Sequence, residues 1–209
     1  MNTDDLLRTL AADATPRRSL LTVLLYGLFP ALGFAFVAVW VTLGLRADLI
    51  QSLSNPLSVA RFLLTGGLGL VGLRLALTLG RPGGRAPLWP LAGLGLIALA
   101  LLAFAYVTTP ADARQMAMVG KTITVCLLSI PLLSVLPVAA ILGMLRNGAS
   151  TAPRLASVVA GLAGGGTAAA IYALHCTEDS PLFYITWYGL AIAIVTLVAT
   201  LIGPRFLRW

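Results

Sequence analysis

Six long apolar runs, separated by short polar breaks, are the feature that most constrains what this chain can fold into. They lie near Leu20–Leu45, Leu57–Leu79, Leu88–Val107, Thr122–Leu145, Leu155–Leu174 and Phe183–Ile202. About 20 apolar residues in a helix cross the roughly 30 Å hydrocarbon core of a bilayer, and backbone groups in lipid must bond within their own segment. The sequence therefore predicts an all-α integral membrane protein with six transmembrane helices, surrounded by the lipid bilayer.

Composition supports the same class. Of the 209 residues, 59% are hydrophobic and 10% are charged, whereas about 25% are charged in an average soluble domain. The alternating apolar and polar pattern of an outer-membrane barrel is absent. We predict a cytoplasmic N-terminal segment at residues 1–19, a transmembrane domain at residues 20–203 and a cytoplasmic tail at residues 204–209.

The placement of positive charges predicts the orientation. Cytoplasmic segments keep an excess of Lys and Arg, and here the N-terminal segment, the second and fourth loops and the tail share most of them. These residues are Arg8, Arg17, Arg18, Arg81, Arg85, Arg146, Arg154, Arg205 and Arg208. Both termini are therefore predicted in the cytoplasm, and in a bacterium the opposite face of the membrane is the periplasmic one. Contact with anionic lipid headgroups explains the net charge of +7, so we expect no direct nucleic-acid partner.

Unusual chemistry gathers in the stretch "YALHCTEDSPLFYITWYG", residues Tyr172 to Gly189. It holds the only histidine, His175, one of two cysteines, Cys176, and the acids Glu178 and Asp179. The predicted topology puts this loop on the periplasmic face. The other cysteine, Cys126, follows Lys121 by five residues, which is about 7 Å along a helix from the same face. Both thiols are thus expected in the outer half of the bundle, on the oxidising side.

Several interpretations of these side chains remain open. Cys126 could be a small buried hydrophobic residue, and the acidic loop a solvated turn. A disulfide requires the two Cα atoms to lie within about 7 Å of each other, which the sequence does not determine. Thiolate and imidazole also suit soft metal ions, so Cys126, Cys176, His175 and Glu178 could bind a heavy metal transiently. The sequence has no CxxC or HxxxH spacing of the kind that indicates a structural zinc site. We therefore expect no permanent cofactor.

The leader "MNTDDLLRTLAADATPRRS" is the second informative stretch. Asp4 and Asp5 suit the positive end of a short helix, and Leu6, Leu7 and Leu10 would form an apolar stripe along it. Such a stripe is too short to fold alone. It could lie on the membrane, pack on the bundle or dock in the groove of a partner protein.

The charges, glycines and prolines of the six spans bear on the class of function and on how the helices pack. The six spans contain no acidic residue, so neither an enzyme nor a transporter with an ionisable central path is favoured. The string "GLGLVG" lies inside an apolar span and is no nucleotide site. Its glycines, with Gly161 and Gly165, are expected to let helices approach closely, whereas Pro131 and Pro137 are expected to kink the fourth span.

Taken together, the leader "TDDLLRTLAADATPRR", the strings "LRNGASTAPRLASVVAGLAGG" and "YALHCTEDSPLFYITWYGLAI", and the terminal "GPRFLRW" resemble the NrsF-like family, negative regulators of sigma F. The resemblance implies a non-enzymatic anti-sigma factor of the bacterial inner membrane that holds an extracytoplasmic-function sigma factor through its N-terminal segment. It also implies that Cys126 and Cys176 sense heavy-metal or oxidative stress in the periplasm. The alternative is a small membrane transporter or an integral-membrane thiol redox protein using the same two thiols.

Overall fold

The computed structural model describes residues 2–5 and 19–207, and within them all regular structure is helical. Six long helices are apolar enough to cross a membrane: α2 (Leu20–Thr42), α4 (Pro56–Leu79), α5 (Trp89–Thr108), α7 (Ile123–Asn147), α8 (Pro153–Tyr172) and α9 (Pro181–Phe206). The prediction of six apolar helices is confirmed. The orientation of their ends in a membrane stays a prediction.

The helix boundaries follow from residues at their ends. Ser19 caps α2, because its Oγ accepts a hydrogen bond from the backbone N–H of Thr22 at 3.1 Å. Proline stands in the first turn of α4, α5, α8 and α9, where the missing N–H costs no helical hydrogen bond. Helix α9 continues through Pro204 to Phe206, past the boundary predicted at residue 203.

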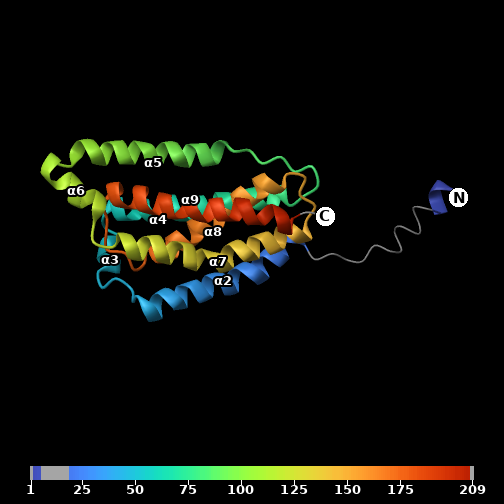
Figure 1. Cartoon of the computed structure of the whole chain (residues 1–209), viewed down its shortest axis with the longest axis horizontal. Coiled ribbons are helices and arrows are strands. Elements are labelled where there is room, and N and C mark those ends of the chain that lie inside the picture. The colour runs from blue at the N-terminus through green and yellow to red at the C-terminus, as the bar shows by residue number, and fades with distance from the viewer. Residues whose placement is uncertain (1, 6–18, 208–209) are drawn as a thin grey trace.

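Two short helices were not predicted. Helix α3 (Leu49–Ser52) follows α2, and α6 (Ala111–Val119) precedes α7. Both lie at one end of the bundle, whereas the start of α2 and the end of α9 lie at the other end (Figure 1). We call the first of these the α3/α6 end and the second the termini end.

Helix α8 occupies the centre of the bundle. It is the most buried of the six long helices and packs against α4, α7 and α9. Small residues permit this: a Cβ added at Gly72 of α4 would lie 2.9 Å from the Cα of Ala163 in α8, and one at Gly161 of α8 would lie 2.5 Å from the Cα of Thr196 in α9. The predicted role of Gly161 in close packing is thereby confirmed.

Helix α5 lies at the periphery, alongside the rest of the bundle (Figure 1). It is the least buried of the long helices and packs against α4 and α9. Large apolar side chains such as Phe34, Trp40 and Leu132 are exposed on the outer faces of the bundle. An apolar surface of this extent suits contact with lipid tails.

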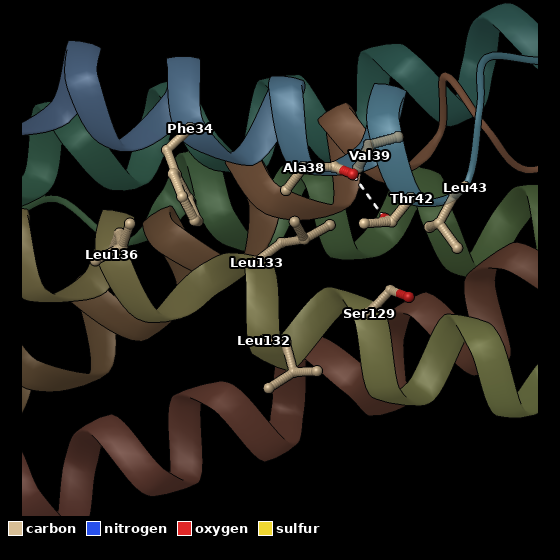
Figure 2. A pocket seen from close by; sticks show the side chains of 9 residues that line it. All are labelled: Phe34, Ala38, Val39, Thr42, Leu43, Ser129, Leu132, Leu133 and Leu136. Atoms are coloured by element: carbon tan, nitrogen blue, oxygen red, sulfur yellow. Dashed lines mark hydrogen bonds between the residues drawn. The ribbon is translucent and has the colours of Figure 1, made fainter.

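A groove of about 240 Å³ lies between α2 and the part of α7 that carries Leu132 and Leu136. Figure 2 shows Phe34 on the α2 side and Leu132, Leu133 and Leu136 on the α7 side. The hydroxyl of Thr42 donates to the carbonyl oxygen of Ala38 at 2.6 Å, as hydroxyls in membrane helices commonly do. The groove is therefore predominantly apolar, and it lies beside the segment of α7 that carries the prolines.

Candidate functional site

The two cysteines lie near the α3/α6 end and share one buried cluster. Cys126 is in the first turn of α7, Cys176 is in the loop between α8 and α9, and both are free thiols with 0% and 1% exposure. The cluster also contains Tyr172, Phe183 and Tyr188. The hydroxyl of Thr122 lies 3.9 Å from the sulfur of Cys176. Both thiols are thus packed among aromatic side chains and shielded from solvent.

Arg46, in the connection between α2 and α3, holds the loop that carries Cys176. Its guanidinium donates to both carboxylate oxygens of Asp179, at 2.8 and 3.1 Å, and to the carbonyl oxygen of Cys176 at 3.3 Å. Its backbone N–H donates to the carbonyl oxygen of Leu174 at 3.0 Å. A two-point contact between arginine and a carboxylate fixes geometry as well as charge. Arg46 therefore fixes the backbone on both sides of His175.

Arg61 holds the same loop from α4. It is fully buried, and it donates to the carbonyl oxygens of Glu178 at 2.8 Å and Ala173 at 3.3 Å. Its Nη2 also lies 3.4 Å from Asp179 Oδ1. A buried guanidinium requires a counter-charge and hydrogen-bond acceptors, and this loop supplies both. We call Arg46, Arg61 and Asp179 the arginine clamp.

The clamp controls the charge state of its carboxylate. Partial burial acts to raise the pKa of Asp179, but the hydrogen bonds from Arg46 and Ser58 and the nearby positive charges of both arginines outweigh it, so the pKa is held below its usual value. A hydrogen bond from Arg46 also lowers the pKa of Asp48. The same carboxylates raise the pKa of Arg46. Asp179 is therefore ionised at neutral pH and links two arginines.

His175 and Glu178 have separate partners. A ring nitrogen of His175, Nδ1, lies 2.9 Å from the carbonyl oxygen of Gly44, which requires the N–H on that nitrogen. Glu178 Oε1 accepts a hydrogen bond from the backbone N–H of Lys121 at 2.8 Å. Gly120, the residue before Lys121, has a φ of +58°, a conformation that glycine adopts readily. A Cβ at Gly120 would lie 2.6 Å from the ring of Phe183, so glycine also permits this segment to approach Phe183 closely.

These contacts bear on the predicted metal-binding set of Cys126, Cys176, His175 and Glu178. Across residues 2–5 and 19–207, no three or more His, Cys, Asp or Glu side chains are arranged to hold a metal ion. The physical reason is that His175 and Glu178 are drawn to different backbone partners, away from a common centre with the thiols. His175, Cys176 and Glu178 thus share one loop, and Cys126 packs in the same buried cluster as Cys176, but the four residues do not form one coordination site in this structure.

The leader is described only in part. Asp4 and Asp5 lie in a single helical turn and are exposed, and the N–H of Asp5 donates to the carbonyl oxygen of Asn2 at 3.1 Å. Leu6, Leu7 and Leu10, the predicted apolar stripe, lie outside the described residues. The partner-binding role of all five residues stays a prediction.

Sequence reasoning missed the arginine clamp, although one signal pointed to it. The loop between α8 and α9 has two acids and no Lys or Arg of its own, so its counter-charges must come from other segments. Arg46 and Arg61 are not among the positive charges predicted in the cytoplasm, and they flank the first loop on the opposite face, where the loop between α8 and α9 is also predicted. Because the chain has few acids, the presence of Glu178 and Asp179 in this loop indicated that positive partners should be sought on the same face.

Comparison with known proteins covers nearly the whole chain. A family model described as "Negative regulator of sigma F" matches residues 10–209. The chain is 35% identical over 216 aligned positions to a probable anti-sigma-F factor of Azospira oryzae, and 34% identical over 219 to an anti-sigma-F factor of Caulobacter vibrioides. Each comparison covers 100% of both chains. No solved structure matches.

Proposed function

The chain belongs to the NrsF family of negative regulators of sigma F, and we propose that it is a membrane-embedded anti-sigma factor that senses stress through Cys126 and Cys176. In this proposal the leader binds an extracytoplasmic-function sigma factor in the cytoplasm of a bacterium. The α3/α6 end faces the periplasm and receives a heavy-metal or oxidative signal. Modification of the thiols then releases the sigma factor.

One observation carries the proposal: both cysteines of the chain occupy the same buried cluster. They belong to the start of α7 and to the loop between α8 and α9, and these segments lie at the end of the bundle opposite the start of α2 (Figure 1). Cys176 is tied into the arginine clamp through its own carbonyl oxygen, 3.3 Å from Arg46 Nη1. Adding an oxygen, a metal ion or a sulfur partner to a side chain that is 1% exposed requires its closely packed surroundings to shift. A chemical change at the thiol is therefore converted into a displacement of the loop.

The displacement has a physical route to the other end of the bundle. Cys126 lies in the first turn of α7, which contains Pro131 and Pro137, and each proline removes one hydrogen bond from the helical ladder. Helix α8 beside it is packed through glycine and alanine and has little room to move. We infer that α7 changes arrangement between the two states, while α8 serves as the fixed support.

The leader is tested by replacing Leu6, Leu7 and Leu10 with alanine. If this stripe docks in a groove of the sigma factor, each substitution removes about 1–3 kcal/mol of apolar burial. Expression of the sigma-dependent genes should then rise without stress, and the variant should fail to co-purify with the sigma factor. Normal repression by the triple variant, at wild-type membrane levels, would refute this role of the leader.

The sensing role is tested with Cys126→Ser and Cys176→Ser. Serine has nearly the shape of cysteine but is far less nucleophilic and binds soft metals poorly. Target-gene expression is measured with and without an oxidant or a thiol-binding metal, and each serine variant should give one constant level. If both variants still respond as the wild type does, the thiols are structural and the sensing proposal fails, whereas repression by the leader is judged by its own experiment.

A further inference from the structure

A second groove lies between the peripheral helix α5 (Figure 1) and the rest of the bundle. It has a volume of about 250 Å³, and α4, α5 and α9 form its walls, with Leu162 of the central helix α8 among the lining residues. Most of its lining side chains are apolar. The groove extends inward to Tyr184 and Tyr188 of α9, which are each 2% exposed. It therefore reaches from the surface of the bundle to the edge of its core.

Glycines on two opposite walls keep this groove open. Gly95 of α5 and Gly189 of α9 line it, and a Cβ added at either residue would meet nothing within 4 Å. Gly72 and Gly161 differ from them, because those glycines let neighbouring helices touch. Gly95 and Gly189 instead leave space between α5 and α9.

Side chains of α5 do not fill the space. The buried residue of α5, Ala105, lies near the end of the helix, and none of residues 89–104 is buried. Exclusion of water does not hold helices together within a membrane, so their association depends on van der Waals packing. A gap between helices loses those contacts. An apolar group from outside the chain is therefore needed to complete the packing of α5 on the bundle.

The chemistry and the size of the groove select a hydrocarbon chain. The hydroxyls of Thr65 and Tyr184 on its walls already donate to the carbonyl oxygens of Arg61 at 2.8 Å and Leu57 at 3.3 Å, so neither is free for a polar ligand. One turn of an α-helix, about 10 Å wide and about 5.4 Å long, exceeds a volume of about 250 Å³. A linear, flexible chain fits such a space, and lipid tails surround apolar spans of this length.

We propose that the groove between α5 and the bundle binds an acyl chain of a membrane phospholipid. The inference rests on the membrane location in the proposed function and is independent of the thiol chemistry. The chain lies next to Gly95 and Gly189, packs against Leu162 and supplies the contacts that α5 lacks. Tyr188 belongs to the buried cluster that contains both cysteines, so the bound chain also contacts a side chain of that cluster.

The test uses the full chain in vesicles of phosphatidylglycerol and phosphatidylethanolamine. A small fraction of phosphatidylcholine carries a photoreactive diazirine on one acyl chain, and mass spectrometry after illumination and digestion identifies the labelled residues. Gly95→Leu and Gly189→Leu place a side chain in the groove from opposite walls. Gly93→Leu is the matched control, because Gly93 is also on α5 and faces open space but does not line the groove. Thermal unfolding checks that each variant is folded.

We expect Leu162 to be labelled in the wild type and in the Gly93→Leu control. The label at Leu162 should be lost in Gly95→Leu and in Gly189→Leu, because a leucine side chain occupies the space of the acyl chain. The label at Leu96, which is exposed on α5, should be the same in all four proteins. An unlabelled Leu162 in the wild type, or equal labelling of Leu162 in all four proteins, would overturn the proposal.

Other occupants and a failure of the membrane location give different results. If a second copy of the chain covers the groove, Leu96 and Leu162 should both be unlabelled while Trp40, exposed on α2, is labelled, and the lipid site falls. Labels at Leu96 and Trp40 without one at Leu162 also remove the lipid site, but they leave the membrane location standing. If none of the three residues is labelled, the membrane location itself fails.

Discussion

Replacing Asp179 with asparagine should destabilise the bundle more than any other single change of a surface-facing side chain at its α3/α6 end. Asp179 is the carboxylate that contacts both Arg46 and Arg61, and Arg61 is fully buried. Removing one partner of a buried ion pair costs about 3–5 kcal/mol. The side chain of Asp179 is 27% exposed, so we expect the lower end of this range, about 3 kcal/mol. For a chain of this length that corresponds to a midpoint of thermal unfolding lower by about 6–12 °C.

The assay is thermal unfolding of the purified protein in detergent micelles, with Asp48→Asn as the matched control. Asp48 also bonds to Arg46, but the side chain of Asp48 is 52% exposed. When the charge of Asp48 is removed, Arg46 still has its ion pair with Asp179. The control should therefore unfold close to the wild-type temperature. An Asp179→Asn variant as stable as the wild type, or a control that falls as far, would refute the reasoning about the clamp.

The pH dependence of the same variant gives a second measurement. The pKa of Asp179 lies below its ordinary value of 3.8 in the folded protein, so the stability contributed by its ionised form is present above pH 3.8 and is lost as the pH falls through the folded pKa. The wild type should keep that contribution at pH 5 and lose it under stronger acid. Asp179→Asn should show a shallower loss over the acid range, and an identical acid profile would contradict the assignment.

Two further predictions concern topology and packing. Reporter fusions after Gly83 and after Asp112 should lie on opposite sides of the membrane, with Gly83 in the cytoplasm; the same side for both would refute the predicted orientation. Gly72→Ala should destabilise the bundle by about 1–3 kcal/mol, because its Cβ would lie 2.8–3.0 Å from Ala163. Gly66→Ala, where a Cβ meets nothing within 4 Å, should unfold like the wild type.

The six long helices were predictable because membrane spans are set by length and apolar composition, which are properties of continuous sequence. Helix α6 was not, since Ala111–Val119 includes Asp112 and Arg114 and has no apolar run long enough to cross a membrane. Its position is fixed by tertiary contacts: Trp187 of α9 donates to the carbonyl oxygen of Met118 at 2.7 Å. Gly161 could be assigned to close packing from its small size alone, but its neighbour, Thr196, could not be read from the pattern.

The candidate site could not be predicted in full, because contacts between segments far apart in the sequence form it. The sequence placed His175, Cys176 and Glu178 within one short stretch, and adjacency along the chain suggested a shared metal site. Neighbouring residues in a loop point in different directions, however, and the backbone groups of Gly44 and Lys121 hold His175 and Glu178. Arg61 lies 118 positions before Asp179 in the numbering, and only the packing of α4 against α8 brings the two together. The sequence indicates that such a long-range ion pair exists, because the acids of this loop have no Lys or Arg nearby in the chain. Which arginine pairs with them depends on how the helices pack.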